Sequence, residues 1–279
     1  MRALRSFLFV PADKTRLLAG AERRGADMVI LDLEDGVAPE KKYDARATLP
    51  DVIGSLSCLG VRVAVRLNED WSEDLPAAMQ PGLVALMLPK VEKPEALIDL
   101  DRAIGGAPAQ KDLRVIALLE SPAAMFDLAR IASAPRLGAL AFGSEDYALA
   151  MATPPGPELL EQPCRMIAMA ASTAGLGAIG LPGSLGDFSD MEAFNAVTTR
   201  ARAMGLTGAL CIHPAQIAPV NAAFGPTERD RIWAADVLAA WEEAAASGAS
   251  VCQLDGRMID RPVIAPARAI SALFQGVIQ

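Results

Sequence analysis

The chain has 279 residues, of which 52% are hydrophobic and only 5% aromatic, so a large core would consist mainly of aliphatic side chains. Its net charge of -8 and its pI near 4.8 argue against nucleic acid as a partner, whereas small anionic molecules remain possible ligands. No run reaches the roughly 18 apolar residues of a membrane span, and the first residues lack the apolar core of a signal peptide. We therefore expect a cytoplasmic protein that contacts neither nucleic acid nor a membrane.

The predicted elements alternate regularly along the chain. Eight short apolar runs predict strands at residues 7–11, 28–33, 62–67, 83–88, 115–119, 137–142, 177–181 and 208–212. Helical periodicity between the runs is clearest at residues 94–104, 123–132, 166–174 and 191–204. Eight such units predict an α/β protein with a (β/α)8 TIM barrel. A doubly wound sheet, the alternative, usually has fewer strands and a glycine-rich first turn.

The chain continues beyond the eighth unit. A long amphipathic helix is predicted from Thr227, its N-cap, to about residue 247, and a tail follows from about residue 250. We expect residues 1–225 to form the barrel. Residues 226–279 would form a C-terminal helical extension that packs on a neighbouring subunit.

The four cysteines and the single histidine limit the kinds of site that the chain can hold. The cysteines have no CxxC spacing, which excludes a zinc cluster and a disulfide framework. No GxSxG motif is present, so a Cys-His or Ser-His-Asp hydrolase would depend on His213 alone as its base. Histidine before proline at a strand end is often a structural hydrogen bonder, and we assign His213 no catalytic role.

Two carboxylates follow neighbouring predicted strands. Glu120 ends the fifth strand and Asp146 lies shortly after the sixth. Because adjacent parallel strands lie about 4.8 Å apart, both side chains would emerge side by side at the barrel face where TIM-barrel enzymes carry their chemistry. Two converging carboxylates suit Mg2+, which prefers oxygen ligands and keeps water or substrate in its other positions. Further polar residues at strand ends are Asp32, Glu34, Asp35, Arg66, Asn68 and Lys90.

Arg66 is the candidate cation of this group. It would point into the barrel mouth, where it could act on a substrate. The alternative is a purely structural ion pair with Asp32 or Glu34.

Nine short motifs occur in order along the chain: RSFLFVPAD, VILDLEDGVAPEKKYDAR, AVRLN, MLPKVEKPE, LLESPAAM, FGSEDYA, CIHPAQI, FGPTE and DGRMIDRP. From Arg5 to about Pro262 they resemble the citrate lyase β-subunit-like group of the HpcH/HpaI aldolase family, which includes malyl-CoA and citramalyl-CoA lyases. The segment GDFSD at residues 186–190 is most similar to the malyl-CoA lyase branch. The resemblance implies a lyase that needs Mg2+, or Mn2+ in its place, and cleaves or forms a carbon-carbon bond in a 3-hydroxyacyl-CoA. Such enzymes are usually homotrimers or dimers of trimers.

The resemblance also assigns roles to individual residues. It implies that Glu120 and Asp146 bind the metal, that Glu120 and Arg66 contact the substrate, and that Arg66 is catalytic. Asp260 matches a catalytic aspartate that reaches the active site of a neighbouring subunit, where it would protonate the enolate. Phe9 and Lys14 match positions that contact coenzyme A.

Three departures from the family pattern bear on the substrate. Pro182 replaces an aspartate after the seventh strand, a lysine before IHP is absent at residues 208–210, and Gly20 replaces a basic residue, although Arg16 and Arg23 are near.

Three alternatives stay open. A citrate lyase β-subunit would act on a carrier-bound citryl thioester. A catalytically silent barrel would act only as a binding protein. A class II aldolase acting on free keto acids would usually have a histidine base near the first strands, which this chain lacks.

Overall fold

The computed structural model describes residues 1, 3–105, 111–186, 190–246 and 251–275 of the 279-residue chain. The chain forms two compact units, Met1–Phe224 and Gly225–Gln279. Within the described residues, no helix combines the length and apolar character that crossing a membrane requires.

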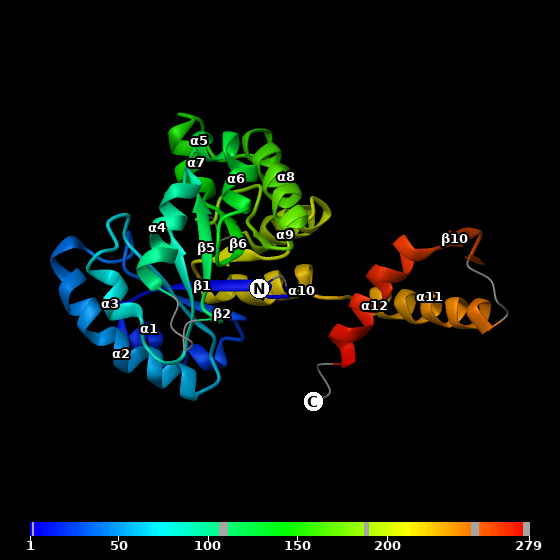
Figure 1. The fold of residues 1–279 in the computed structure, drawn as a ribbon, viewed down its shortest axis with the longest axis horizontal. Helices are drawn as coiled ribbons and strands as arrows, with labels where there is room; N and C mark the ends of the chain where they lie inside the picture. The colour runs from blue at the N-terminus through cyan, green and yellow to red at the C-terminus, as the bar shows by residue number, and fades with distance from the viewer. Residues whose placement is uncertain (2, 106–110, 187–189, 247–250, 276–279) are drawn as a thin grey trace. The chain divides into compact units, whose positions relative to one another are not determined.

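Eight parallel strands form the barrel of the first unit (Figure 1). They are β1 Ser6–Pro11, β2 Met28–Asp32, β3 Val63–Arg66, β4 Leu83–Leu88, β5 Arg114–Leu119, β6 Leu137–Phe142, β7 Gly177–Ile179 and β8 Ala209–Cys211. Strands β1 to β7 pair in sequence order, and β1 pairs with β8 on its other side. The ring closes where Ile179 forms a parallel bridge with Gly208. The eight predicted strands and the (β/α)8 barrel are therefore confirmed.

Close approach of the chain requires a glycine at position 208. A Cβ atom at Gly208 would lie 2.4 Å from the backbone oxygen of Arg5, which precedes β1. Only glycine fits where β8 begins beside this segment.

Helices follow the strands around the barrel. They are α1 Thr15–Leu18, α2 Lys42–Cys58, α3 Asp74–Ala78, α4 Pro94–Ile104, α5 Pro122–Phe126, α6 Leu128–Ala132, α7 Ser144–Ala150, α8 Pro157–Ala174, α9 Met191–Ala203 and α10 Ile217–Phe224, with short 3-10 turns at Ala21–Arg23, Pro39–Lys41 and Pro214–Gln216. Proline stands at the start of α4, α5 and α8, where its missing N–H costs no helical hydrogen bond. The predicted helices at 94–104, 166–174 and 191–204 are present, the second as part of a longer helix.

The predicted helix at 123–132 is instead two short helices. Asp127 lies between α5 and α6 with φ -106° and ψ 10°, outside the helical region. Its side chain accepts a hydrogen bond from Arg130 Nη1, and its backbone oxygen accepts one from Ile131. The chain therefore leaves the helical conformation at Asp127 and resumes it at Leu128.

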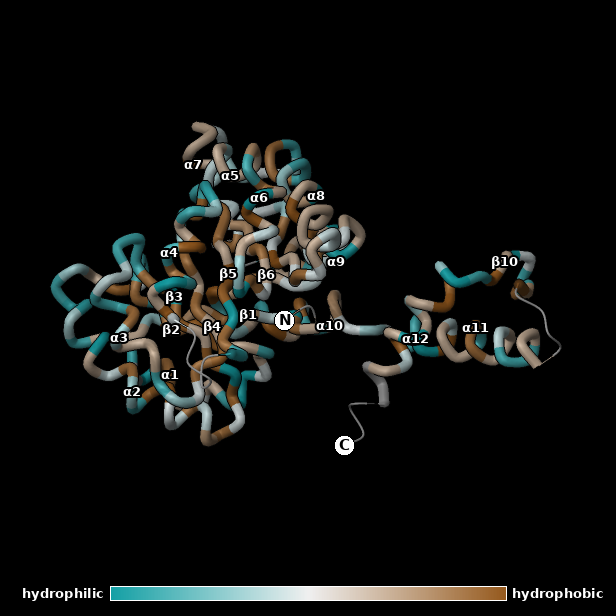
Figure 2. Tube along the Cα trace, in the orientation of Figure 1, coloured by the Kyte–Doolittle hydropathy of each residue, from teal (hydrophilic) through white to brown (hydrophobic). Residues whose placement is uncertain are grey.

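The core lies within and around the sheet (Figure 2). All five residues of β2 are buried, as expected for a parallel strand that is covered on both faces. This continuous burial explains why the strands appear in the sequence as unbroken apolar runs.

The second unit has its own small core. Helix α11 (Glu228–Ala246) and helix α12 (Arg261–Gln275) pack together, and β9 (Cys252–Leu254) pairs antiparallel with β10 (Arg257–Ile259). Thr227 caps α11 as predicted, because its Oγ1 accepts a hydrogen bond from Asp230 N at 3.1 Å and Asp230 Oδ2 accepts one from Thr227 N at 2.8 Å.

Candidate metal and substrate site

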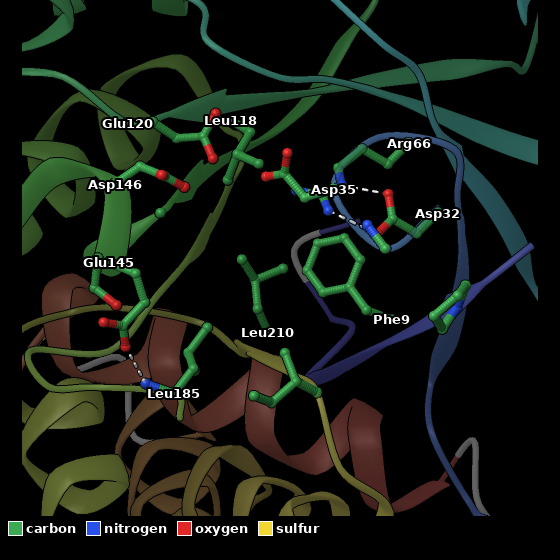
Figure 3. A pocket seen from close by; sticks show the side chains of 15 residues that line it. Phe9, Asp32, Asp35, Arg66, Leu118, Glu120, Glu145, Asp146, Leu185 and Leu210 are labelled. Carbon is green, nitrogen blue, oxygen red and sulfur yellow. Dashed lines mark hydrogen bonds and ion pairs between the residues drawn. The ribbon is translucent and has the colours of Figure 1, made fainter. Parts of the chain in front are cut away.

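A cavity of about 330 Å³ lies at the C-terminal ends of the barrel strands (Figure 3). Its lining comes from β1, β2, β3, β5 and β8 and from the segments that follow β2, β5, β6, β7 and β8. The lining residues are Phe9, Pro11, Asp32, Asp35, Gly36, Arg66, Leu118, Glu120, Gly143, Ser144, Glu145, Asp146, Leu185, Leu210 and Ile212. The structure thus brings together four of the predicted site residues, Phe9, Arg66, Glu120 and Asp146.

Glu120 and Asp146 lie together on one side of this cavity (Figure 3). Glu120 follows β5 and is 6% exposed, and its Oε2 accepts a hydrogen bond from Lys90 N at 2.8 Å. Asp146 lies in the first turn of α7. Gly143 makes room for this arrangement, because a Cβ there would come within 2.6 Å of Glu120 Cγ.

The charge of Glu120 is not balanced by the protein around it. Burial raises the pKa of Glu120 to about 8, and the charges of Glu34 and Asp146 act in the same direction against the hydrogen bond from Lys90 N and the charge of Arg66. A cation at this position would relieve the repulsion between the carboxylates. The electrostatics of the pair therefore fit a divalent metal ion.

The number of available ligands also fits Mg2+. Among the described residues there is no group of three or more histidine, cysteine or acidic side chains that could hold a metal. A site with two carboxylates leaves the other positions of an octahedral ion to water and substrate oxygens, as Mg2+ prefers.

Arg66 lies opposite this pair and is fixed by two buried carboxylates. Its Nε and Nη2 each donate a hydrogen bond of 2.7 Å to Asp32, and its Nη1 lies 2.8 Å from Glu34 Oε2. Burial lowers the pKa of Arg66, but the hydrogen bonds and charge of Asp32 outweigh it and raise the pKa above its usual value. The guanidinium also stands over the Phe9 ring, with Cζ 4.8 Å from the ring centroid.

Asp32 is the anchor of this arrangement. Besides the two bonds from Arg66, its Oδ1 accepts a bond from Glu34 N and its Oδ2 one from Gly36 N, both at 2.9 Å. Four donors therefore hold the carboxylate. It orients Arg66 and has little capacity left to accept a hydrogen bond from a substrate.

Lys90 links the two charged groups. Its Nζ lies 3.1 Å from Glu34 Oε1, while its backbone N holds Glu120. Its φ of 53° is in the left-handed region, which costs a residue with a side chain about 1 kcal/mol or more. Such strain is often found where a backbone must hold a functional group in place.

The loops after β6, β7 and β8 are tied together by Glu145 and Gln216. Glu145 Oε1 accepts hydrogen bonds from Ser184 Oγ at 2.6 Å and Leu185 N at 2.9 Å. Gln216 is fully buried; its Nε2 donates to Leu185 O, and its Oε1 accepts from Ile212 N and His213 N. These bonds fix the backbone of the loops that form the rest of the cavity wall.

Other predicted residues lie outside the cavity lining. Lys14 forms an ion pair of 2.6 Å with Asp13. His213 Nδ1 accepts a hydrogen bond from Ala215 N, in keeping with a structural role. Asp260 belongs to the second unit, where its backbone oxygen accepts bonds from Val263 and Ile264 at the start of α12. Pro182 is buried, and residues 187–189 of the GDFSD segment lie outside the described residues.

Sequence reasoning missed two residues that shape the site, Glu145 and Gln216. Glu145 precedes Asp146 in the same strand-end motif, which was a usable signal. Gln216 lies in the motif CIHPAQI, but nothing in its spacing indicates that a glutamine there would be fully buried.

Comparison with known proteins identifies the family. The family model for HpcH/HpaI aldolase/citrate lyase matches residues 5–214. The chain is 32% identical over 277 residues to the citrate lyase subunit beta-like protein of Deinococcus radiodurans, and 31% identical over 279 residues to a (3S)-malyl-CoA thioesterase of Cereibacter sphaeroides, with 96% of each chain covered in both cases. It also resembles the solved structure of Mycobacterium tuberculosis CitE in complex with magnesium, acetoacetate and coenzyme A, with a TM-score of 0.75 and 31% identity over 97% of this chain and 98% of that one. The protein therefore belongs to the HpcH/HpaI aldolase/citrate lyase family.

Proposed function

We propose that the protein is a Mg2+-dependent acyl-CoA lyase that cleaves or forms a 3-hydroxyacyl-CoA such as malyl-CoA or citramalyl-CoA. The observation that carries the proposal is the placement of buried Glu120 beside Asp146, opposite a guanidinium fixed by Asp32, in one cavity. The similarity to a protein solved with magnesium and coenzyme A supports the choice of metal and thioester.

Glu120 and Asp146 would hold the metal ion. When bound, Mg2+ acts as a Lewis acid that lowers the pKa of a hydroxyl group and stabilises the oxyanion formed from it. Burial of Glu120 suits this task, because a carboxylate in a low-dielectric site interacts strongly with a cation.

Arg66 would stabilise the developing negative charge on the substrate. Two of the five N–H groups of the guanidinium donate to Asp32, and Nη1 forms an ion pair with Glu34, so N–H groups are left for substrate oxygens. Because the guanidinium is fixed before the reaction, it needs no reorganisation as charge develops. Removing one such donor typically costs about 10²- to 10³-fold in rate.

Asp260 is the proposed proton donor to the thioester enolate. Its side chain would enter the active site of a neighbouring subunit in a homotrimer or dimer of trimers. The resemblance to the family motif DGRMIDRP supports this assignment. An exchange experiment tests it: mixing Asp260→Asn with Glu120→Gln should restore activity, because a hybrid oligomer combines an intact metal site with an intact second unit. Proven subunit exchange without recovered activity would refute delivery by a neighbour.

We propose that the protein acts in the cytoplasm. The four cysteines, Cys58, Cys164, Cys211 and Cys252, are free thiols, which supports a reducing compartment.

The direct test is a panel of malyl-, citramalyl-, methylmalyl- and citryl-CoA, assayed for release of the short acyl-CoA with Mg2+ and with excess chelator. We expect cleavage of at least one thioester that stops in chelator. Full activity in chelator would contradict the metal assignment. A parallel measurement of free coenzyme A separates cleavage of the carbon-carbon bond from thioester hydrolysis, the activity for which the Cereibacter sphaeroides relative is named.

The second candidate is a citrate lyase β-subunit that acts on a carrier-bound citryl thioester, which similarity to a citrate lyase subunit beta-like protein favours. Turnover of a free coenzyme A thioester in the absence of any carrier protein would argue against it.

A further inference from the structure

Helix α7 carries two carboxylates that line the cavity, Glu145 and Asp146, at successive positions of its first turn. Successive positions of a helix do not share a face. Figure 3 accordingly shows the two side chains pointing in different directions, the first toward Leu185 and the second toward Glu120. Glu145 Oε1 accepts hydrogen bonds from Ser184 Oγ at 2.6 Å and Leu185 N at 2.9 Å. Glu145 thus binds the loop after β7 instead of facing the proposed metal site.

Helix α7 needs such a contact to fix its direction. It is seven residues long, well below the roughly 12–15 residues at which an isolated helix becomes marginally stable. Its N-cap, Gly143, has no side chain to hold the first N–H groups. Ser144, Tyr147 and Ala148 attach one face of the helix to the barrel. A bond that acts off this face, such as that of Glu145, fixes the rotation of the helix about its own axis.

The loop that donates these bonds is itself fastened to the barrel. Gln216, which is fully buried, donates a 2.9 Å hydrogen bond from its Nε2 to Leu185 O. Its Oε1 accepts bonds from Ile212 N at 2.8 Å and His213 N at 3.0 Å. Leu185 is therefore held at its N–H by Glu145 and at its carbonyl by Gln216. An unbroken series of bonds runs from α7 through the loop after β7 to the segment after β8.

We propose that Glu145 is a positioning residue that couples the metal site to the cavity wall. Its bonds to Ser184 and Leu185 hold the first turn of α7 so that Asp146 faces Glu120. This role rests on the metal assignment of the proposed function and adds to it a residue that does not touch the metal. Replacing a residue that orients a metal ligand typically weakens metal binding by about 10- to 100-fold.

The coupling acts in both directions. If an ordered loop strengthens metal binding, a bound metal ion stabilises the ordered loop by the same free energy. Mg2+ held by Glu120 and Asp146 would restrict the movement of α7. Through Glu145 it would also reduce the opening of the hydrogen bond at Leu185 N. This part of the cavity wall would then be most ordered when the metal ion needed for the reaction is bound.

Two other roles for Glu145 predict different behaviour. It could be a third metal ligand, or its charge alone could attract the cation, since it lines the same cavity. Loss of the negative charge would weaken metal binding in both of these cases. The positioning role needs only an oxygen that accepts two hydrogen bonds, which an amide also offers. Glu145→Gln therefore separates the positioning role from the other two.

Calorimetry of Mg2+ binding to the full-length variants makes this distinction. Glu145→Ala removes both bonds and should bind Mg2+ about 10-fold or more weakly, whereas Glu145→Gln should stay close to the wild-type affinity. Ser184→Ala removes one bond without changing any charge and should show part of the loss. Glu158→Ala is the matched control, because it removes an exposed glutamate from the first turn of α8, outside the cavity lining, and should leave the affinity unchanged.

Several results would overturn the positioning role. Equal losses in Glu145→Gln and Glu145→Ala would assign the effect to the charge, and an unchanged affinity in Glu145→Ala would show that there is no coupling. A wild-type protein that binds no Mg2+ would contradict both this role and the metal assignment. If the affinities follow the expected order but no thioester is cleaved, the coupling is supported and the proposed reaction is wrong.

Hydrogen exchange measures the coupling from the side of the loop. In the wild type, Mg2+ should slow exchange of the Leu185 amide, which donates to Glu145. In Glu145→Ala, exchange of this amide should not respond to Mg2+. The Ser72 amide, which donates to Asp70 outside the cavity lining, is the control and should not respond in either protein. Slowing at Leu185 to the same extent in both proteins would overturn the inference, because the metal would then order the loop without Glu145.

Discussion

Replacing Asp32 by asparagine should destabilise the barrel by about 3 kcal/mol. Four donors meet the Asp32 carboxylate, two at each oxygen: Arg66 and Glu34 N at Oδ1, Arg66 and Gly36 N at Oδ2. In Asp32→Asn the amide group brings its own N–H toward one of these donor pairs, whichever way it is turned. Two bonds to the charged carboxylate, one from Arg66 and one from a backbone N–H, are then lost, and each contributes roughly 1.5–3 kcal/mol. This sum agrees with the roughly 3–5 kcal/mol that breaking a buried ion pair costs.

Thermal unfolding followed by circular dichroism measures the effect. For a domain of this size a loss of about 3 kcal/mol corresponds to a decrease in Tm of roughly 6–12 °C. Asp35→Asn is the matched control, because it makes the same change three residues further along on an exposed side chain and should stay within about 0.5 kcal/mol. If both variants unfold at the same temperature, the anchoring role of Asp32 is wrong.

Three further predictions follow from the same region and from the core. Lys90→Gly should be about 1 kcal/mol more stable than Lys90→Ala in urea unfolding, because both lose the ammonium but only glycine relaxes at φ 53°; equal stability would contradict the strain. Glu120→Gln should lose Mg2+ binding in calorimetry, whereas Glu158→Gln, outside the cavity lining, should retain it. Burial raises the pKa of Cys164 and Cys211 to about 12, so at pH 8 both stay protonated and a thiol reagent should modify exposed Cys58 first; equally fast modification of all three would refute this.

The strands could be predicted because parallel strands inside a barrel are buried on both faces. Each of them is therefore an apolar run, and β2 shows this along its whole length. The break between α5 and α6 could not be predicted, because the apolar spacing continues from Ala124 through Leu128 to Ile131 as in one helix. What ends α5 is the non-helical backbone conformation of Asp127, which apolar periodicity does not record.

The residues of the site also differ in whether the sequence could predict their positions. Glu120 and Asp146 could be placed together because topology fixes where a residue just after a strand emerges. Gln216 could not, because its partners Leu185 and Ile212 come from two different loops whose approach no local pattern encodes.

For Arg66, a structural ion pair and a role in binding substrate do not exclude each other. The structure has the ion pairs that a structural role predicts, with both Asp32 and Glu34. A guanidinium has five donors in one rigid plane, so two carboxylates can fix it and still leave N–H groups for a ligand. An arginine without those carboxylates would have to be ordered by the substrate itself, at an entropic cost in every binding event. The buried pair is therefore what makes Arg66 suited to stabilise an oxyanion, and the same carboxylates account for both its stability and its proposed chemistry.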